Sequence, residues 1–335
     1  MSIPFAINGL GRIGRGLVRV ARERPDLELV AANDPAEPAV IARLLRHDTV
    51  HGAFPGEVAA WDGGLEIDGR RLPLFREAEP ARIPWRETGA AIVVEATGHF
   101  RTRNEAAAHL GGPVERVLVS AVADGMDATF CVGINHRGYD PARHRVVSNA
   151  SCTTNCLAPV LLVLHRAFGV EAALMNTVHC MTNSQNLVDM AHPDPRRARA
   201  AAANIIPTTS DAIPSIGLVL PELAGKVDGL AMRVPGVAGS LIDVTVRLAR
   251  PAARDDLADA YRAAAAGDLA GILGVTDEEL VSSDFIGDPR SAIVDLPLLQ
   301  EVDRRLFRVV AWYDNEWGYI NRLADLLEWM GRAER

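Results

Sequence analysis

A glycine-rich turn between an apolar strand and an amphipathic helix is the strongest constraint on the fold. The apolar run covers 4–8, the turn contains Gly9, Gly11 and Gly14, and the pattern at 17–21 predicts a helix. Glycines at these spacings permit a sharp turn, close helix–strand packing and approach of the backbone to a pyrophosphate at the helix N-terminus. The order strand, turn, helix therefore predicts a Rossmann dinucleotide-binding domain.

A second predicted strand, 27–32, ends at Asp34. A carboxylate about 20 residues beyond the glycines accepts hydrogen bonds from the adenosine ribose of NAD and repels the 2′-phosphate of NADP, so we expect NAD as the cofactor. Apolar runs at 91–96 and 116–121 extend the parallel sheet. Thr97 and Ser120 lie at the ends of these strands, where we expect the cofactor cleft.

A cysteine stands at the start of a predicted helix in the segment 148–156, among small hydroxyl and amide side chains. The helix body runs from Leu157 to Phe168, so Cys152 falls in its first turn, where backbone N–H groups favour an anion. Beside a cation, such a position lowers a thiol pKa below its ordinary value of about 8.5. We expect Cys152 to act as a thiolate nucleophile.

The best candidate for a base is His179, which follows the apolar strand 173–178. A histidine at a strand end faces a cleft, and the polar pair Thr182-Asn183 and the basic segment 196–199 follow it. Several other histidines, His109 among them, lie in polar surroundings with no evident partner. We therefore expect His179 to take the proton from Cys152.

The second half of the chain has a different pattern. The alternating segments 239–249 and 306–313 predict half-buried antiparallel strands, and 252–266 predicts a helix. The predicted fold class is α/β, with a Rossmann domain and a mixed α+β catalytic domain whose sheet is largely antiparallel. The expected boundaries are 1–150 for the NAD-binding domain, 151–315 for the catalytic domain, and 316–335 for a C-terminal helix that packs back on the NAD-binding domain.

Composition excludes several classes of function. A net charge of −8 over 335 residues argues against a nucleic-acid-binding surface, and no apolar run approaches the ~20 residues of a membrane span. The four cysteines lack metal-type spacing, so we expect free thiols and no metal. We expect a cytoplasmic protein with no membrane partner.

Six segments together make the chain resemble the phosphorylating glyceraldehyde-3-phosphate dehydrogenase family from end to end. They are 7–15, 148–159, 204–209, 217–222, 232–235 and 312–319. The resemblance implies a homotetramer that oxidises glyceraldehyde 3-phosphate with NAD, forms a cysteine thioester and releases it to inorganic phosphate as 1,3-bisphosphoglycerate.

The resemblance also implies residue roles. Cys152 would attack the aldehyde and His179 would accept the proton. The cofactor would be held by the glycine turn and four further contacts: Arg12 and Ile13 at the pyrophosphate, Asp34 at the ribose and Asn315 at the nicotinamide amide. The substrate phosphate or the attacking phosphate would be held by Thr182, Arg197 and Arg233, and the inorganic-phosphate pocket would be lined by Ser151, Thr153 and Ser210.

The sequence departs from the family pattern beside that pocket. Ser210-Asp211 replaces the usual Thr-Gly, and Asp211 would place a like charge near the incoming phosphate. Release of the thioester to water, as in erythrose-4-phosphate dehydrogenase, therefore stays open, as does another small phosphorylated aldehyde in a specialised paralogue. Met190-Ala191 replaces a Leu-Pro pair that lies beside the adenosine ribose in many NAD-dependent members, but Asp34 still favours NAD.

Two hypotheses stand outside this enzymology. One is a scaffold protein that has lost catalysis, which the intact Cys152, His179 and Asn315 disfavour. The other is a zinc site made from Cys152, Cys156, His179 and Cys180, which the helical offset of Cys156 from Cys152 disfavours.

Overall fold

The computed structural model describes residues 2–333, and the chain divides into two compact units. The first unit comprises Met1–Phe130, His136–Ala150 and Ile320–Arg335, and the second comprises Cys131–Asn135 and Ser151–Tyr319. The predicted α/β class with a Rossmann domain and a mixed catalytic domain is confirmed. The boundaries predicted at 150/151 and 315/316 remain a proposal about functional domains.

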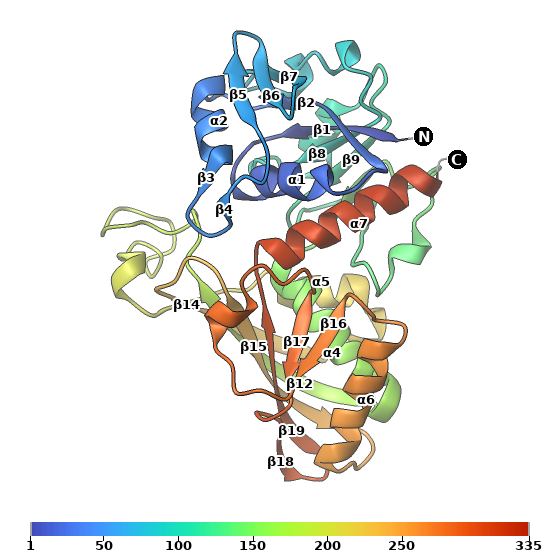
Figure 1. The fold of residues 1–335 in the computed structure, drawn as a ribbon. Helices are drawn as coiled ribbons and strands as arrows, with labels where there is room; N and C mark the ends of the chain where they lie inside the picture. The colour runs from blue at the N-terminus through green and yellow to red at the C-terminus, as the bar shows by residue number, and fades with distance from the viewer. Residues whose placement is uncertain (1, 334–335) are drawn as a thin grey trace. The chain divides into compact units, whose positions relative to one another are not determined.

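The first unit is built on a nine-stranded sheet (Figure 1). Its order is β10 (Ala128–Thr129), β11 (Val146–Ser148), β9 (Arg116–Val119), β8 (Ile92–Glu95), β1 (Ile3–Asn8), β2 (Leu27–Asn33), β7 (Arg70–Phe75), β6 (Gly64–Ile67) and β5 (Val58–Trp61). The other elements are the hairpin β3 (His47–Asp48) and β4 (Gly52–Ala53), helices α1 (Arg12–Arg22), α2 (Pro38–Arg46) and α3 (Arg103–Ala106), and the 3₁₀ turns Pro80–Arg82, Trp85–Glu87, Ala107–His109 and His136–Gly138.

Strand β1 lies at the point where the strand order reverses. Strands β1, β2, β8 and β9 pair in parallel, and the chain passes from β1 to β2 on one side before β8 joins β1 on the other. In an open parallel sheet, ligands bind outside the carboxyl ends of the strands at such a switch point. Gly9, Asp34, Thr97 and Ser120 all follow the carboxyl ends of these strands.

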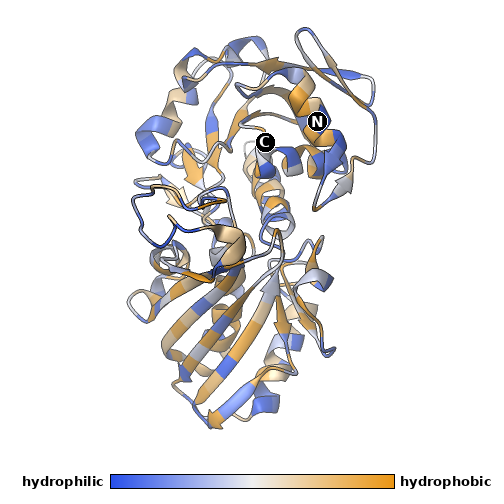
Figure 2. Ribbon diagram, turned by 90° about the vertical axis from the view of Figure 1, so that its left-hand side faces the viewer, coloured by the Kyte–Doolittle hydropathy of each residue, from blue (hydrophilic) through white to orange (hydrophobic). Residues whose placement is uncertain are grey.

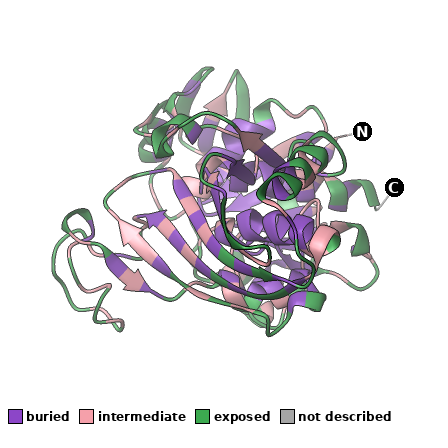
Figure 3. Cartoon of the chain, turned by 90° about the horizontal axis from the view of Figure 1, so that it is seen from below, coloured by how far each residue is buried: buried purple, intermediate pink, exposed green. Residues whose placement is uncertain are grey.

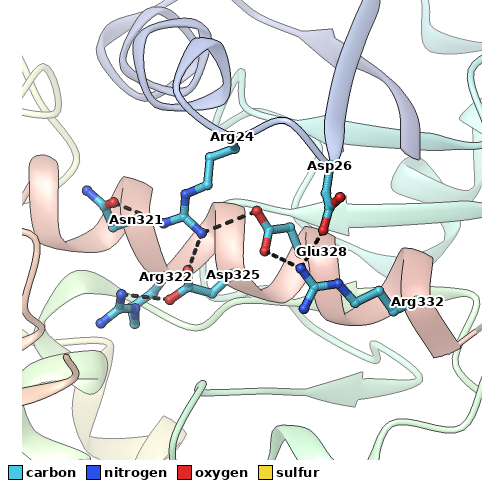
Figure 4. A network of polar contacts seen from close by, with 7 residues as sticks. All are labelled: Arg24, Asp26, Asn321, Arg322, Asp325, Glu328 and Arg332. Carbon is cyan, nitrogen blue, oxygen red and sulfur yellow. Dashed lines mark hydrogen bonds and ion pairs between the residues drawn. The ribbon is translucent and has the colours of Figure 1, made fainter. Parts of the chain in front are cut away.

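The C-terminal helix predicted within 316–335 is α7 (Trp317–Ala333), and residues 334–335 of that predicted segment lie outside the described residues. From Ile320 onward, α7 belongs to the first unit. Figure 4 shows its polar contacts there: Arg24 pairs with Asp325 at 2.5 Å, and Arg332 pairs with Asp26 at 2.6 Å.

The apolar side of α7 contributes more to this packing than its ion pairs. Ile320, Leu323, Ala324 and Leu327 recur at helical spacing and are fully buried. Burying a leucine or isoleucine side chain stabilises by about 1.5–3 kcal/mol. A partly exposed ion pair such as Arg24–Asp325 contributes about 0–1 kcal/mol.

The second unit is built on an eight-stranded mixed sheet. Its order is β13 (Ile206–Thr208), β14 (Val227–Val234), β12 (Val170–Cys180), β15 (Ser240–Leu248), β19 (Leu306–Tyr313), β17 (Ala292–Asp295) and β16 (Leu273–Thr276), and β18 (Gln300–Asp303) also pairs with β19. Its helices are α4 (Cys152–Phe168), α5 (Ala212–Val219) and α6 (Arg254–Ala266), with 3₁₀ turns at Ala201–Ala203, Pro221–Leu223 and Ser282–Phe285. The two long alternating segments are β15 and β19, which pair antiparallel as predicted.

Burial alternates along the central strands of this sheet (Figure 3), and hydrophilic and hydrophobic residues follow one another along the same strands (Figure 2). On β12, Ala173, Met175 and Thr177 are buried, whereas Leu174 between them is 64% exposed. Side chains alternate between the faces of a strand, so one face of the sheet is covered and the opposite face is partly open. Among the described residues, no helix combines the length and the hydropathy that crossing a membrane requires.

Candidate active site and cofactor site

Cys152 is the first residue of α4. Ala150 adopts a left-handed conformation (φ 55°) before it, and Ser151 caps the helix by accepting a hydrogen bond from the Thr154 N–H at 3.0 Å. A non-glycine residue in this conformation is uncommon and marks a sharp turn. The turn and the cap present the Cys152 thiol, which is half-buried, at the helix N-terminus as predicted.

The structure brings Cys152 and His179 together. Cys152 Sγ lies 3.5 Å from His179 Nε2. His179 is the penultimate residue of β12, where it is buried and pairs in register with Arg233 of β14. Because the two strands are parallel and in register, the His179 and Arg233 side chains emerge side by side.

The contacts of Nδ1 bear on the tautomer of His179. The Cys180 carbonyl oxygen, which can only accept, lies 2.7 Å from Nδ1, and in the tautomer that donates to this oxygen Nε2 presents its lone pair to the thiol. Arg233 Nη1 donates to the same carbonyl at 3.2 Å and lies 2.5 Å from Nδ1. Burial, reinforced by the Arg233 cation, lowers the pKa of His179 to about 3.

The expected lowering of the Cys152 pKa is wrong. Burial raises the pKa of the Cys152 thiol, and the nearby Arg233 cation and the Thr153 hydroxyl offset only part of that rise. The physical reason is desolvation, which disfavours the thiolate more than these groups favour it. The pair is therefore a neutral thiol beside a neutral imidazole, a donor facing a base.

Tyr313 anchors this pair, although it was not predicted from the sequence as a site residue. Its hydroxyl lies 3.0 Å from the hydroxyls of both Thr153 and Thr177. Thr177 donates to the Leu241 carbonyl at 2.9 Å, so its oxygen accepts from Tyr313, whose oxygen in turn accepts from Thr153. The chain of hydrogen bonds ties the first turn of α4 to β12 and β19. The only signal was the position of Tyr313 inside the segment 312–319.

The predicted phosphate ligands divide into two groups. Arg233 is at the Cys152–His179 pair, as are Ser151 and Thr153, whose hydroxyls are engaged by Thr154 and Tyr313. Arg197 makes a separate set of contacts: its Nε donates to Thr208 of β13 at 2.8 Å and is 3.5 Å from Asp194, and β13 pairs with β14, the strand that carries Arg233. Asp194 and Thr208 are further polar residues that the sequence analysis did not assign.

The other predicted phosphate ligands have local contacts. Thr182 bonds Ser184 and Gln185, and Ser210 accepts from the Ala212 N–H at 3.4 Å. Asp211 occupies the N-cap position of α5, is exposed, and makes no capping hydrogen bond. The roles predicted for these residues remain predictions.

In the first unit, the glycine turn is tightly packed at Gly9 and Gly14 and open at Gly11, so a ligand can approach its backbone at Gly11. A Cβ at Gly14 would lie 2.0 Å from the Gly9 carbonyl oxygen, and a Cβ at Gly9 (φ +95°) would lie 2.8 Å from the Thr97 nitrogen. At Gly11, by contrast, a Cβ would meet nothing within 4 Å. The α1 N-terminus, which has no side-chain cap, therefore opens toward solvent at Gly11, and this arrangement fits a dinucleotide pyrophosphate.

Two predicted cofactor contacts are constrained by neighbours. Asp34 accepts from the Leu10 N–H at 2.8 Å and the Ala36 N–H at 2.9 Å, which ties the end of β2 to the glycine turn. The Arg12 guanidinium pairs with Asp48 of β3. Burial alone would raise the pKa of Asp48, but the hydrogen bonds from Arg12 and from the His51 and Val50 N–H groups together outweigh it, and the pKa falls to about 2. Because its guanidinium is paired with Asp48, Arg12 would contact the pyrophosphate through its backbone N–H, as would Ile13.

A buried network supports the predicted Thr97 contact and corrects the interpretation of His109. His109 is fully buried, accepts from the Trp85 indole N–H at 3.0 Å, and donates to Glu95 at 3.0 Å. Glu95 also accepts from Asn8 at 2.6 Å and from the Thr97 N–H at 2.8 Å. No partner for His109 was evident from the sequence, because its contacts come from residues distant in the chain.

Asn315 follows β19 and is buried, with 7% of its surface exposed. Its Oδ1 accepts from the Cys180 thiol and the Ser240 hydroxyl, each at 3.2 Å. Within residues 2–333, no protein group bonds its Nδ2. An almost fully buried amide with its N–H groups unused fits a ligand carbonyl, such as that of a nicotinamide amide.

The side chains named in the zinc hypothesis do not form a set of metal ligands in this structure. No group of three or more His, Cys, Asp or Glu side chains in the described part of the chain could hold a metal ion. All four cysteines are free, and Cys156 is fully buried one helical turn beyond Cys152.

Fold and site together define a class: NAD-binding oxidoreductases that carry a cysteine–histidine pair on a mixed-sheet catalytic domain. The family models described as "Glyceraldehyde 3-phosphate dehydrogenase, NAD binding domain" and "Glyceraldehyde 3-phosphate dehydrogenase, C-terminal domain" match residues 3–103 and 151–315. The chain belongs to the glyceraldehyde-3-phosphate dehydrogenase family, and its cofactor is NAD.

Relatives in this family match over nearly their whole length. The chain is 52% identical over 325 residues to a glyceraldehyde-3-phosphate dehydrogenase of Kitasatospora aureofaciens, which covers 97% of this chain and 98% of that relative. It is 47% identical over 333 residues to the protein of that name from Streptomyces coelicolor, covering 99% of each chain. With the one from Geobacillus stearothermophilus it shares 45% identity over 326 residues, covering 97% of each.

Proposed function

We propose that the protein oxidises glyceraldehyde 3-phosphate with NAD and inorganic phosphate to 1,3-bisphosphoglycerate through a thioester on Cys152. The observation that carries the proposal is the 3.5 Å contact between Cys152 Sγ and His179 Nε2 in a chain of this family. A nucleophile within hydrogen-bond reach of an oriented base is the arrangement that covalent catalysis requires.

The first step transfers one proton and forms one bond. Cys152 Sγ attacks the aldehyde carbon as its proton passes to His179 Nε2, and His179 then gives the same proton to the former carbonyl oxygen, which leaves a neutral hemithioacetal and a neutral imidazole. Because burial favours the uncharged form of both the thiol and the imidazole, we assign the proton transfer to the same step as the attack. The Cys180 carbonyl, which accepts from Nδ1–H, stabilises the imidazolium that forms.

Oxidation and release follow at the same carbon. His179 accepts the hydroxyl proton of the hemithioacetal while the carbon loses a hydride, which leaves a thioester. NAD, when bound, supplies the chemistry of a hydride acceptor. A phosphate oxygen then attacks the thioester carbon and the carbon–sulfur bond breaks, which releases the acyl phosphate. The departing Cys152 sulfur takes back the proton held by His179 Nε2, so both groups return to their starting state.

The positive charge that binds the substrate phosphate and the attacking inorganic phosphate comes from arginine side chains. We assign Arg233 to the phosphate nearest Cys152, because its guanidinium already lies against His179. Arg197, Thr182, Ser151, Thr153 and Ser210 complete the proposed ligands. An arginine fork and threonine or serine hydroxyls match the geometry of a phosphate.

The test measures NADH formation from glyceraldehyde 3-phosphate and from erythrose 4-phosphate, each with and without inorganic phosphate. We expect phosphate-dependent turnover that is faster with the triose. Faster, phosphate-independent turnover with erythrose 4-phosphate would overturn the proposal. Cys152→Ser should lower kcat at least about 10³-fold, because a serine hydroxyl is a far weaker nucleophile; Cys156→Ser serves as a control for removing a thiol from the same helix.

We also propose a homotetramer in the cytoplasm. The open face of the second-unit sheet supports assembly, because Leu174 and Leu230 are 64% and 41% exposed on neighbouring strands. Four free cysteines, one of them a proposed nucleophile, support a reducing compartment.

A further inference from the structure

Three buried polar side chains meet at the ends of three adjacent strands of the second unit. Cys180 ends β12, Ser240 begins β15, and Asn315 follows β19. Their exposed fractions are 1%, 2% and 7%. Each side chain is therefore almost completely shielded from water, so a donor or acceptor that lost its partner here could not be satisfied by solvent, and the direction of each hydrogen bond among the three affects stability.

The hydrogen bonds in this cluster have only one consistent direction. The Cys180 backbone N–H donates to Ser240 Oγ at 3.2 Å, and a backbone N–H cannot accept. The Ser240 hydroxyl proton is thereby directed to Asn315 Oδ1 at 3.2 Å. The Cys180 thiol donates to the same oxygen, also at 3.2 Å. Two donors therefore converge on one amide oxygen.

The convergence orients the Asn315 amide. If the amide rotated by half a turn, the Ser240 hydroxyl proton and the Cys180 thiol proton would lose the oxygen that now accepts them, and the NH₂ would have only the second lone pair of the Ser240 oxygen and the weakly accepting Cys180 sulfur to donate to. The observed orientation leaves Nδ2 as the group presented to a ligand. Burial raises the pKa of Cys180 to about 12, so its sulfur stays protonated and remains a donor at neutral pH.

We propose that Cys180, together with Ser240, is a positioning residue for hydride transfer: it holds the Asn315 amide so that Nδ2 binds the nicotinamide carboxamide and only one face of the ring receives hydride. The inference rests on the proposed function, which assigns Asn315 to the nicotinamide amide. It gives a role to a thiol that takes no part in the covalent chemistry.

The contacts separate Cys180 from the nucleophile. Its sulfur lies 3.8 Å from His179 Nδ1, the nitrogen that donates to the Cys180 carbonyl, whereas Cys152 faces the basic Nε2. Cys180 therefore has no base within reach to activate it. Its effect on the reaction passes through Asn315.

The experiment compares Cys180→Ala, which removes the donor, with Cys180→Ser, which keeps one. Each enzyme reduces NAD that carries deuterium at C4 of the nicotinamide, and NMR of the product measures the share of hydride added to each face. We expect Cys180→Ala to raise KM for NAD about 3- to 10-fold, the effect of one lost hydrogen bond, and to yield a measurable minor stereoisomer. Cys180→Ser should retain the wild-type KM and stereochemistry.

Cys131→Ala is the matched control, because Cys131 is equally buried and does not contact Asn315. If Cys180→Ala matches wild type and Cys131→Ala in both readouts, the inference is wrong. Ser240→Ala removes the other donor to Asn315 Oδ1 and should also yield a minor stereoisomer of the product. The inference therefore stays testable if Cys180→Ala folds poorly.

Failure of the proposed function would be recognised separately. If wild-type enzyme forms no NADH from glyceraldehyde 3-phosphate, calorimetric titration with NAD still compares Kd among the variants. A Kd raised in Cys180→Ala and restored in Cys180→Ser supports the positioning role. Equal Kd values in all variants overturn it.

Discussion

Burial determines the protonation of the reactive pair more than the helix that presents the thiol. Cys152 stands at a helix N-terminus beside Arg233, yet desolvation raises its pKa, and burial together with Arg233 lowers the pKa of His179 to about 3. Both shifts favour the uncharged form of each group. In such a pair neither group is ionised at rest, and charges form on sulfur and imidazole only when an electrophile reacts with the thiol.

The depressed pKa of His179 predicts a specific loss of stability in acid. The unfolded chain binds a proton near pH 6.5 and the folded chain only near pH 3, so this histidine destabilises the fold as pH falls through that window. At pH 5 the loss is about 2 kcal/mol relative to neutral pH. His179→Asn should therefore show a flatter dependence of the free energy of unfolding on pH between 6.5 and 5, measured by denaturant titration.

The control for this prediction is His99→Asn, which replaces an exposed histidine of the first unit. Its stability curve should run parallel to that of wild type. If the curve of His179→Asn also runs parallel to wild type, His179 does not carry the depressed pKa, and the neutral-pair mechanism loses its basis.

At the scale of elements, the register between strands brings together site residues that lie far apart in the sequence. The parallel register of β12 and β14 pairs His179 with Arg233, and the antiparallel register of β15 and β19 pairs Ser240 with Tyr313. These pairings place the base, the cation, the anchor of Thr153 and the Asn315 lock around the end of one strand, β12.

The limits of prediction follow from the range of each interaction. The glycine turn, the helix after Cys152, and β15 and β19 could be predicted because they depend on local periodicity and turn chemistry. The Tyr313 anchor and the His109–Glu95 network could not, since their partners are set by register and packing across long stretches of chain. The direction of the Cys152 pKa was missed for the same reason: desolvation is a property of the packed unit.

The N-terminus of α5 carries a prediction about phosphate use. Asp211 is an exposed carboxylate at the position where the dipole of α5 would otherwise favour an anion. Asp211→Gly should lower KM for inorganic phosphate roughly 2- to 5-fold, the effect of removing one like charge near a helix terminus. Steady-state NADH formation at varied phosphate measures this value.

Asp211→Asn keeps the side-chain size without the charge and should reproduce most of that gain. KM for glyceraldehyde 3-phosphate should change less than KM for phosphate in both variants. An unchanged KM for phosphate in Asp211→Gly would mean that Asp211 lies away from the attacking phosphate, and that its departure from the family pattern has no effect on release of the thioester.

For the whole molecule, the two units differ in what they leave open. The first unit has its parallel strands buried within an α/β architecture, with apolar residues such as Phe5, Ile7 and Val93 fully enclosed. The second unit buries one face of its sheet, whereas Leu174 and Leu230 stand in the open face on neighbouring strands. Exposed leucines in the middle of a sheet are typical of a surface that another copy covers.

The proposed homotetramer therefore predicts that charge on this face breaks the assembly. Wild-type protein should elute with four times the mass of one chain in size-exclusion chromatography with light scattering. Leu174→Glu and Leu230→Glu should shift it to smaller species, because a carboxylate buried without a partner in an apolar interface is strongly destabilising. Leu44→Glu on α2 is the matched control, since Leu44 is 41% exposed, the same fraction as Leu230. If both sheet variants keep the wild-type mass while the control does too, the copies associate through another surface, and the open face of the second-unit sheet needs a different explanation.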